Sequence, residues 1–94
     1  MMNLRTNRRV GFFYVSDLYN DEKFFDDFPV VLAHLRIVPT RVEYLYERAA
    51  FEYRAYSPFF DELKNGEKIP VYDVIIIRDE HGEFDNATVR RRIE

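Results

Sequence analysis

The chain has 94 residues, of which 47% are hydrophobic and 33% charged, and its formal net charge is −3. This length is typical of one compact domain, which usually takes roughly 100–150 residues. The sequence contains no cysteine, which excludes disulfide frameworks, thiolate metal sites and cysteine nucleophiles, but it contains nine Phe and seven Tyr.

The N-terminal part predicts a flexible stretch followed by a strand. We expect a single domain over residues 1–94, with residues 1–7 flexible. Residues 9–16 are β-branched and aromatic, which is typical of a strand, and they are apolar on both faces, which favours a central position. Their apolar run is too short for a signal peptide, and no segment reaches the roughly 20 apolar residues that cross a bilayer. We therefore expect a cytoplasmic protein that does not contact a membrane.

A helix is predicted to begin near Asn20, whose side chain can cap the first turn. Acidic residues follow it, and the positive end of the helix dipole favours them there. Apolar residues then recur with helical spacing as far as Leu35, which predicts one apolar helical face. Pro29 has no amide hydrogen and disfavours helix at the residue before it, so one kinked helix and two short helices both fit. Pro39 is expected to end the segment.

Residues 40–57 fit two different structures. As a helix, they begin with a capping box formed by Thr40 and Glu43. As a hairpin, both halves alternate between apolar and charged side chains, and their many Tyr and Phe residues prefer strands. The weak point of the hairpin is its turn at residues 48–50, which lacks the usual turn residues. We favour the hairpin and keep the helix as the alternative.

The C-terminal half predicts a short helix and a second hairpin. Residues 58–64 fit the helix, with Ser57 as its cap and Pro58 at its first position. Residues 71–78 form the clearest strand of the chain, and residues 83–93 return antiparallel to it after a polar turn.

The order of these elements predicts an α+β fold, in which helices cover one face of a small antiparallel sheet. With a hairpin at residues 40–57, the order is β-α-β-β-α-β plus a terminal strand, which is the ferredoxin-like arrangement. If these residues are helical, the order becomes β-α-α-β-β.

Residues with catalytic chemistry are scarce, so we expect no enzyme, no cofactor and no metal site. His34, one of two histidines, lies within an apolar stretch that predicts a structural role. His81 lies in a turn beside Asp79, Glu83 and Asp85, whose alternate spacing is compatible with a divalent metal. Ordinary turn chemistry accounts for the same residues, because Asp and Gly are typical of hairpin loops.

The best candidate for function is a group of tyrosine and charged residues in the middle of the chain. Tyrosine and arginine are enriched at the hot spots of protein interfaces. Alternatively, the tyrosine rings build the core while their hydroxyls reach water. The predicted partner-binding residues are Tyr44, Tyr46, Glu52, Tyr53, Arg54 and Tyr56.

Charge is distributed unevenly along the chain. Residues 11–86 contain eight Lys or Arg against sixteen Asp or Glu, so the body carries −8, while both ends are basic. Acidic residues at the predicted helix start suit a basic partner, such as a nucleic-acid-binding complex, or form a solvated face. They are Asp17, Asp21, Glu22, Asp26 and Asp27. The terminal arginines form an alternative site for nucleic acid, because guanidinium groups bind phosphate well. They are Arg5, Arg8, Arg9, Arg90, Arg91 and Arg92.

These features predict a small non-enzymatic protein that binds a macromolecular partner, with inhibition of that partner as one outcome. An accessory protein, such as a phage inhibitor of a host or defence complex, fits the small size and the acidic body. The alternatives are a nucleic-acid-binding module and a small-ligand-binding oligomer. A homodimer is also expected, because an exposed sheet edge or a Tyr-rich face needs a cover.

Overall fold

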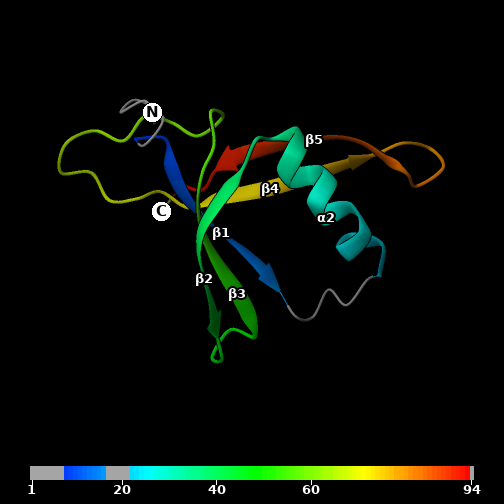
Figure 1. Cartoon of the computed structure of the whole chain (residues 1–94), viewed down its shortest axis with the longest axis horizontal. Coiled ribbons are helices and arrows are strands. Elements are labelled where there is room, and N and C mark those ends of the chain that lie inside the picture. The colour runs from blue at the N-terminus through cyan, green and yellow to red at the C-terminus, as the bar shows by residue number, and fades with distance from the viewer. Residues whose placement is uncertain (1–7, 17–21, 94) are drawn as a thin grey trace.

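Five strands and one helix make up the part of the chain that the structure describes (Figure 1). This computed structural model describes residues 8–16 and 22–93, without the side chains of residues 22–25. The elements are β1 (Val10–Ser16), α2 (Glu22–His34), β2 (Val38–Leu45), β3 (Ala50–Tyr56), β4 (Tyr72–Arg78) and β5 (Phe84–Arg91). Three strands, in the order β1-β3-β2, form antiparallel sheet A, and β4 pairs with β5 in antiparallel sheet B.

The two sheets are joined through Pro70 and Val71, which lie beside β1. The backbone N–H of Phe12 donates to the Pro70 carbonyl at 2.9 Å, and Phe12 forms a parallel bridge with Val71. The Val71 carbonyl in turn accepts the backbone N–H of Arg92 at 2.8 Å. The sheets therefore meet at this corner, and Figure 1 shows them diverging from it.

The helix α2 runs through Pro29 as one element, so the two-helix alternative is wrong. It ends in a Schellman motif, in which the N–H of Arg36 donates to the Ala33 carbonyl at 3.2 Å and that of Ile37 to the Leu32 carbonyl at 2.8 Å. Arg36 takes the left-handed backbone conformation that this motif requires, with φ at 51°. This reversal directs the chain from the helix into β2.

The core lies between the inner face of sheet A, α2 and the facing side of sheet B. Phe13 stacks on Tyr53 with ring centroids 4.9 Å apart, and Phe28 of α2 meets Tyr53 edge-on at 5.5 Å. Phe60, from the loop before β4, stacks on Tyr72 at 4.4 Å. Aromatic pairs of this kind stabilise a core beyond the area that they bury. The other buried members of this core are Val31, Leu35, Ile37, Ala55 and Ala87.

The predicted ferredoxin-like α+β fold is wrong, because the described chain is mostly β, with one helix and two small sheets. Residues 58–64 are not helical, and two of their amides bond to distant groups. The Asp61 N–H donates to the Tyr72 hydroxyl and the Leu63 N–H to the Arg8 carbonyl, both at 2.7 Å. A helix would direct both amides to carbonyls four residues earlier. The β-α-α-β-β alternative is wrong as well.

Residues 40–57 form the predicted hairpin, and the helix alternative is wrong. Its turn closes without Gly, Asn or Asp, because Ala49 adopts left-handed backbone with φ at 48° and its N–H donates to the Tyr46 carbonyl at 3.3 Å. The central strand of sheet A is β3, which pairs on both sides, and not β1 as predicted. The apolar character of β1 reflects its packing against Phe60 and Tyr72.

The predicted C-terminal hairpin is confirmed as β4 and β5. Its turn is held by Asp79, whose Oδ1 accepts the N–H of His81 at 2.8 Å and that of Glu83 at 2.9 Å. These bonds assign Asp79 to turn structure. Among the described residues, no group of three or more His, Cys, Asp or Glu side chains is arranged to hold a metal ion.

Candidate functional site

The predicted Tyr/Arg/Glu set is divided between the two faces of sheet A. Directly paired residues on antiparallel strands share a face, and successive residues alternate. Tyr53 pairs with Val42 and Phe51 pairs with Tyr44, all on the inner face toward the core. The remaining members lie elsewhere: Glu52, Arg54 and Tyr56 on the outer face, and Tyr46 in the turn.

Tyr53 belongs to the core and is not an exposed anchor. Its ring contacts Phe13 of β1 and Phe28 of α2. Burial raises the pKa of the Tyr53 phenol above its ordinary value. Within the predicted set, Tyr53 therefore has a structural role.

Three aromatic rings gather at the turn end of the β2–β3 hairpin. Tyr44 meets Tyr46 and Phe51 edge-to-face, with ring centroids 4.8 and 4.9 Å apart. Tyr46 is 87% exposed, the neighbouring Val42 51% and Phe51 37%. We call Val42, Tyr44, Tyr46 and Phe51 the aromatic tip. Sequence reasoning missed Val42 and Phe51, which the pairing register of the hairpin would have indicated.

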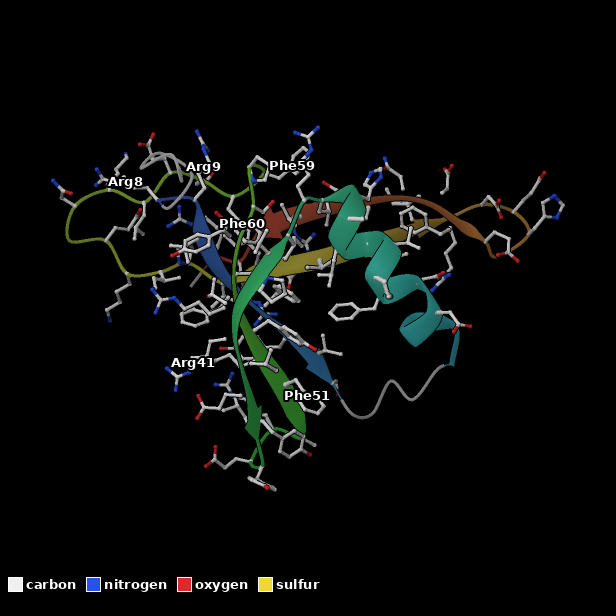
Figure 2. The ribbon with its side chains drawn as sticks, in the orientation of Figure 1. Arg8, Arg9, Arg41, Phe51, Phe59 and Phe60 are labelled. Atoms are coloured by element: carbon white, nitrogen blue, oxygen red, sulfur yellow. The ribbon has the colours of Figure 1, made fainter. Side chains whose placement is uncertain are left out.

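The outer face of sheet A carries two rows of like charge. Arg41 of β2 lies directly opposite Arg54 of β3, and Glu43 lies opposite Glu52. Like charges in opposite positions destabilise a sheet. Along β2, Arg41 Nη2 lies 3.3 Å from Glu43 Oε2. We call these four residues the charged rows, and Figure 2 shows Arg41 and Phe51 on opposite sides of the hairpin.

Tyr14 of β1 lies beside the acidic row and holds one of its carboxylates. Its hydroxyl donates to Glu52 Oε2 at 2.9 Å, and the Arg48 guanidinium lies 5.4 Å above its ring centroid. Burial, followed by the hydrogen bond to Glu52, raises the pKa of the Tyr14 phenol. The Tyr14 hydroxyl therefore holds the Glu52 carboxylate in place. Glu43 lies on the edge strand β2, where its side chain is half exposed.

The predicted acidic patch lies only partly within the described residues. Asp17, Asp21 and the Glu22 side chain lie outside them. Asp26 is exposed, but Asp27 forms a partly buried ion pair with Arg78 of β4. Asp27 therefore ties α2 to sheet B, and the patch does not act as one exposed group.

The arginines before β1 bond to the loop between β3 and β4. Arg5 lies outside the described residues. Arg8 donates to the Asn65 side-chain oxygen at 2.6 Å, and Arg9 donates to the Phe60 carbonyl at 2.8 Å. Both described arginines therefore hold this loop against the start of β1.

The arginines at the end of β5 pair with carboxylates. Arg90 and Arg92 both approach Asp73, at 3.5 and 2.5 Å. Arg91 lies 3.3 and 3.2 Å from two carboxylates of the preceding loop, Asp61 and Glu67. Their charge is largely compensated within the chain, which weakens a phosphate site at this end.

The Asp73 carboxyl is expected to titrate below its ordinary pKa. The hydrogen bond from Arg92 lowers the pKa of Asp73 most, and Arg90 adds to the effect. Because the folded pKa lies below the unfolded one, the pairing stabilises the fold at higher pH and is lost as the pH falls through the folded value. We expect Arg92→Gln to return the Asp73 pKa toward its ordinary value in an NMR carboxyl titration. An unchanged pKa would contradict this ion pair.

Hollows at the surface of the described chain include two of several hundred cubic ångströms. One, of about 550 Å³, is lined by residues 67–71 and 91–93, and another, of about 420 Å³, lies between His34, Phe59 and β5. These hollows are where the small-ligand alternative would place its ligand. Arg91, at the first hollow, is already paired with Glu67.

Comparison of the chain with protein-family models, with curated proteins and with solved structures gives no match. Within the described residues, no helix combines the length and apolar character needed to cross a bilayer.

Proposed function

We propose that this protein is a non-enzymatic binding module that engages a protein partner through the aromatic tip. The observation that carries the proposal is the contact of Tyr44 with both Tyr46 and Phe51 at an exposed end of the hairpin. This end projects away from sheet B, as Figure 1 shows, so a partner can approach it.

The aromatic tip has the physical properties of an interface anchor. Contiguous exposed apolar side chains mark interaction sites, and tyrosine supplies a large contact area with few rotatable bonds. The contacts of Tyr44 with Tyr46 and Phe51 already restrict the three rings. Less conformational entropy is therefore lost when a partner covers them.

The charges of the domain favour a basic partner. The whole chain carries a net charge of −3, and a field of this sign attracts positively charged surfaces over distance. Glu52, Arg54 and Tyr56 lie on the opposite face of sheet A from the aromatic tip. They would contribute to recognition only where the partner reaches around the hairpin to that face. A partner that fits has an apolar pocket for Tyr46 beside basic residues. Occupation of such a pocket is how a small domain would inhibit its partner.

The proposal is tested by affinity purification of the tagged protein from its source cells. We expect the double variant Tyr44→Ala/Tyr46→Ala to capture the partner at least tenfold less, because Tyr truncation at a hot spot costs about 2 kcal/mol or more. Ile77→Ala is the control, since Ile77 is exposed on β4, away from the tip. The proposal would be contradicted if the tip variant captured as much partner as the original protein. It would also be contradicted if the control variant lost as much capture as the tip variant.

A further inference from the structure

One edge of sheet A is formed by β2, which among the described residues pairs with β3 alone. The Thr40 hydroxyl donates to the Arg54 carbonyl at 3.1 Å, so this carbonyl points toward β2. Antiparallel pairing alternates, so the backbone groups of Arg41 and Glu43 point to β3 and those of Val42 point outward. Val42 therefore offers one donor and one acceptor at the sheet edge.

The charged rows leave each charged residue of β2 without an opposite charge on the neighbouring strand β3. Inside the chain, Arg41 faces Arg54 and Glu43 faces Glu52. Arg41 and Glu43 contact each other along β2 at 3.3 Å, but each also has a like charge on its inner side and keeps a side chain that is at least half exposed. A neighbouring strand with a carboxylate beside Arg41 and a guanidinium beside Glu43 would add an attractive pair on the outer side of each residue and offset the repulsion on its inner side.

We propose that the strand which meets this requirement is β2 of a second copy of this chain, paired antiparallel about a two-fold axis at Val42. In this register, Val42 lies opposite the partner's Val42, and each exchanges its N–H and C=O with the other. Arg41 then lies opposite the partner's Glu43, and Glu43 opposite the partner's Arg41. The sequence of β2 is thus complementary to itself in charge.

The same edge limits the assembly to a dimer. Pro39 and the irregular pairing between Pro39 and Arg41 end the regular strand on one side, and the turn after Leu45 ends it on the other. The two-fold arrangement uses the same edge of both copies, so it closes and does not form a fibre. The opposite edge of sheet A is β1, and Val71 already pairs with Phe12 at that edge. Because the paired stretch is short, we expect the dimer to be weak, with a dissociation constant roughly in the micromolar range.

This inference does not rest on the proposed function, and its test reads a different property. Sedimentation equilibrium of the untagged protein over a range of concentrations measures the dimer dissociation constant. We expect Arg41→Glu and Glu43→Arg each to weaken dimerisation by about tenfold or more, because each places like charges opposite one another twice. Each substitution removes one like-charge pair between β2 and β3 but also the Arg41–Glu43 ion pair along β2, so urea denaturation of each variant checks that loss of the dimer does not reflect unfolding.

Two rescue experiments distinguish charge pairing from a general effect. The double variant Arg41→Glu/Glu43→Arg exchanges the two charges and is expected to dimerise like the original protein. An equimolar mixture of the two single variants is expected to form a heterodimer, since one carries two acids and the other two arginines at the edge. A monomeric original protein, unaffected single variants, or failure of both rescues would overturn the proposal.

Discussion

Replacement of Phe60 by alanine is expected to lower the free energy of unfolding by about 3–5 kcal/mol. Phe60 is 0% exposed, and its ring stacks on Tyr72 with centroids 4.4 Å apart. Truncation removes the whole ring and leaves a cavity that the surrounding strands cannot close fully. Because a domain of this kind has only about 5–15 kcal/mol of stability, this substitution removes a large part of it.

The neighbouring phenylalanine provides a matched control. Phe59 is 56% exposed, so Phe59→Ala removes the same atoms without opening a buried cavity, and we expect a loss below about 1 kcal/mol. Both variants are measured by urea denaturation with linear extrapolation to water. Equal losses would contradict the placement of Phe60 in the core and Phe59 at the surface.

Gly11→Ala is expected to destabilise the protein by about 1–3 kcal/mol, although it adds a single carbon. A Cβ at Gly11 would lie 2.6 Å from Cδ2 and 2.7 Å from Cε2 of Tyr72. The Tyr72 ring is held in place, because Phe60 stacks on it and its hydroxyl accepts the Asp61 N–H at 2.7 Å. On the other side, β1 is held by its pairing with β3. Neither element can yield without losing contacts of its own.

A double-mutant cycle with Tyr72→Leu tests the cause of this effect. Tyr72→Leu destabilises the core by itself, but it creates space beside Gly11. We therefore expect Gly11→Ala to cost less in the Tyr72→Leu background than in the original protein. If the two costs were equal, the collision would involve another group, such as the Phe60 ring, which lies 3.2 Å from the same Cβ position.

The two proposed surfaces are separable by experiment. Substitutions of Tyr44 and Tyr46 change the aromatic tip, whereas the charge exchange at Arg41 and Glu43 changes the outer face of the edge strand. A two-fold axis at Val42, perpendicular to the sheet, leaves both aromatic tips on the same face of the joined sheets. A dimer would therefore present two binding surfaces to one side and gain from bivalent attachment.

Local sequence patterns predicted the C-terminal hairpin and favoured a hairpin over a helix at residues 40–57. Alternation and β-branched or aromatic residues identify the segments that became β2, β3, β4 and β5. A hairpin needs only neighbouring residues and a turn, so its information lies within a short stretch of chain. The Asp79 turn follows the same rule, because its bonds to His81 and Glu83 span only a few residues.

The candidate sites were predicted less well, because a site depends on which face points to the core. Alternation along β3 separates Tyr53 from Glu52 and Arg54, but it does not say which side α2 covers. Packing against Phe28 assigned Tyr53 to the core. Similarly, the count of terminal arginines did not reveal that Asp73 pairs with both Arg90 and Arg92.

By itself, the sequence determined β1 and the C-terminal hairpin, and it favoured a hairpin with separated aromatic and charged side chains at residues 40–57, where the tertiary structure excluded the helix. Only the tertiary structure decided that residues 58–64 are not helical and that the strands form two sheets. The physical reason is that an amide bonds to the best acceptor within reach. For Asp61 that acceptor is the Tyr72 hydroxyl, and for Leu63 it is the Arg8 carbonyl, both supplied by distant segments that pack around Phe60.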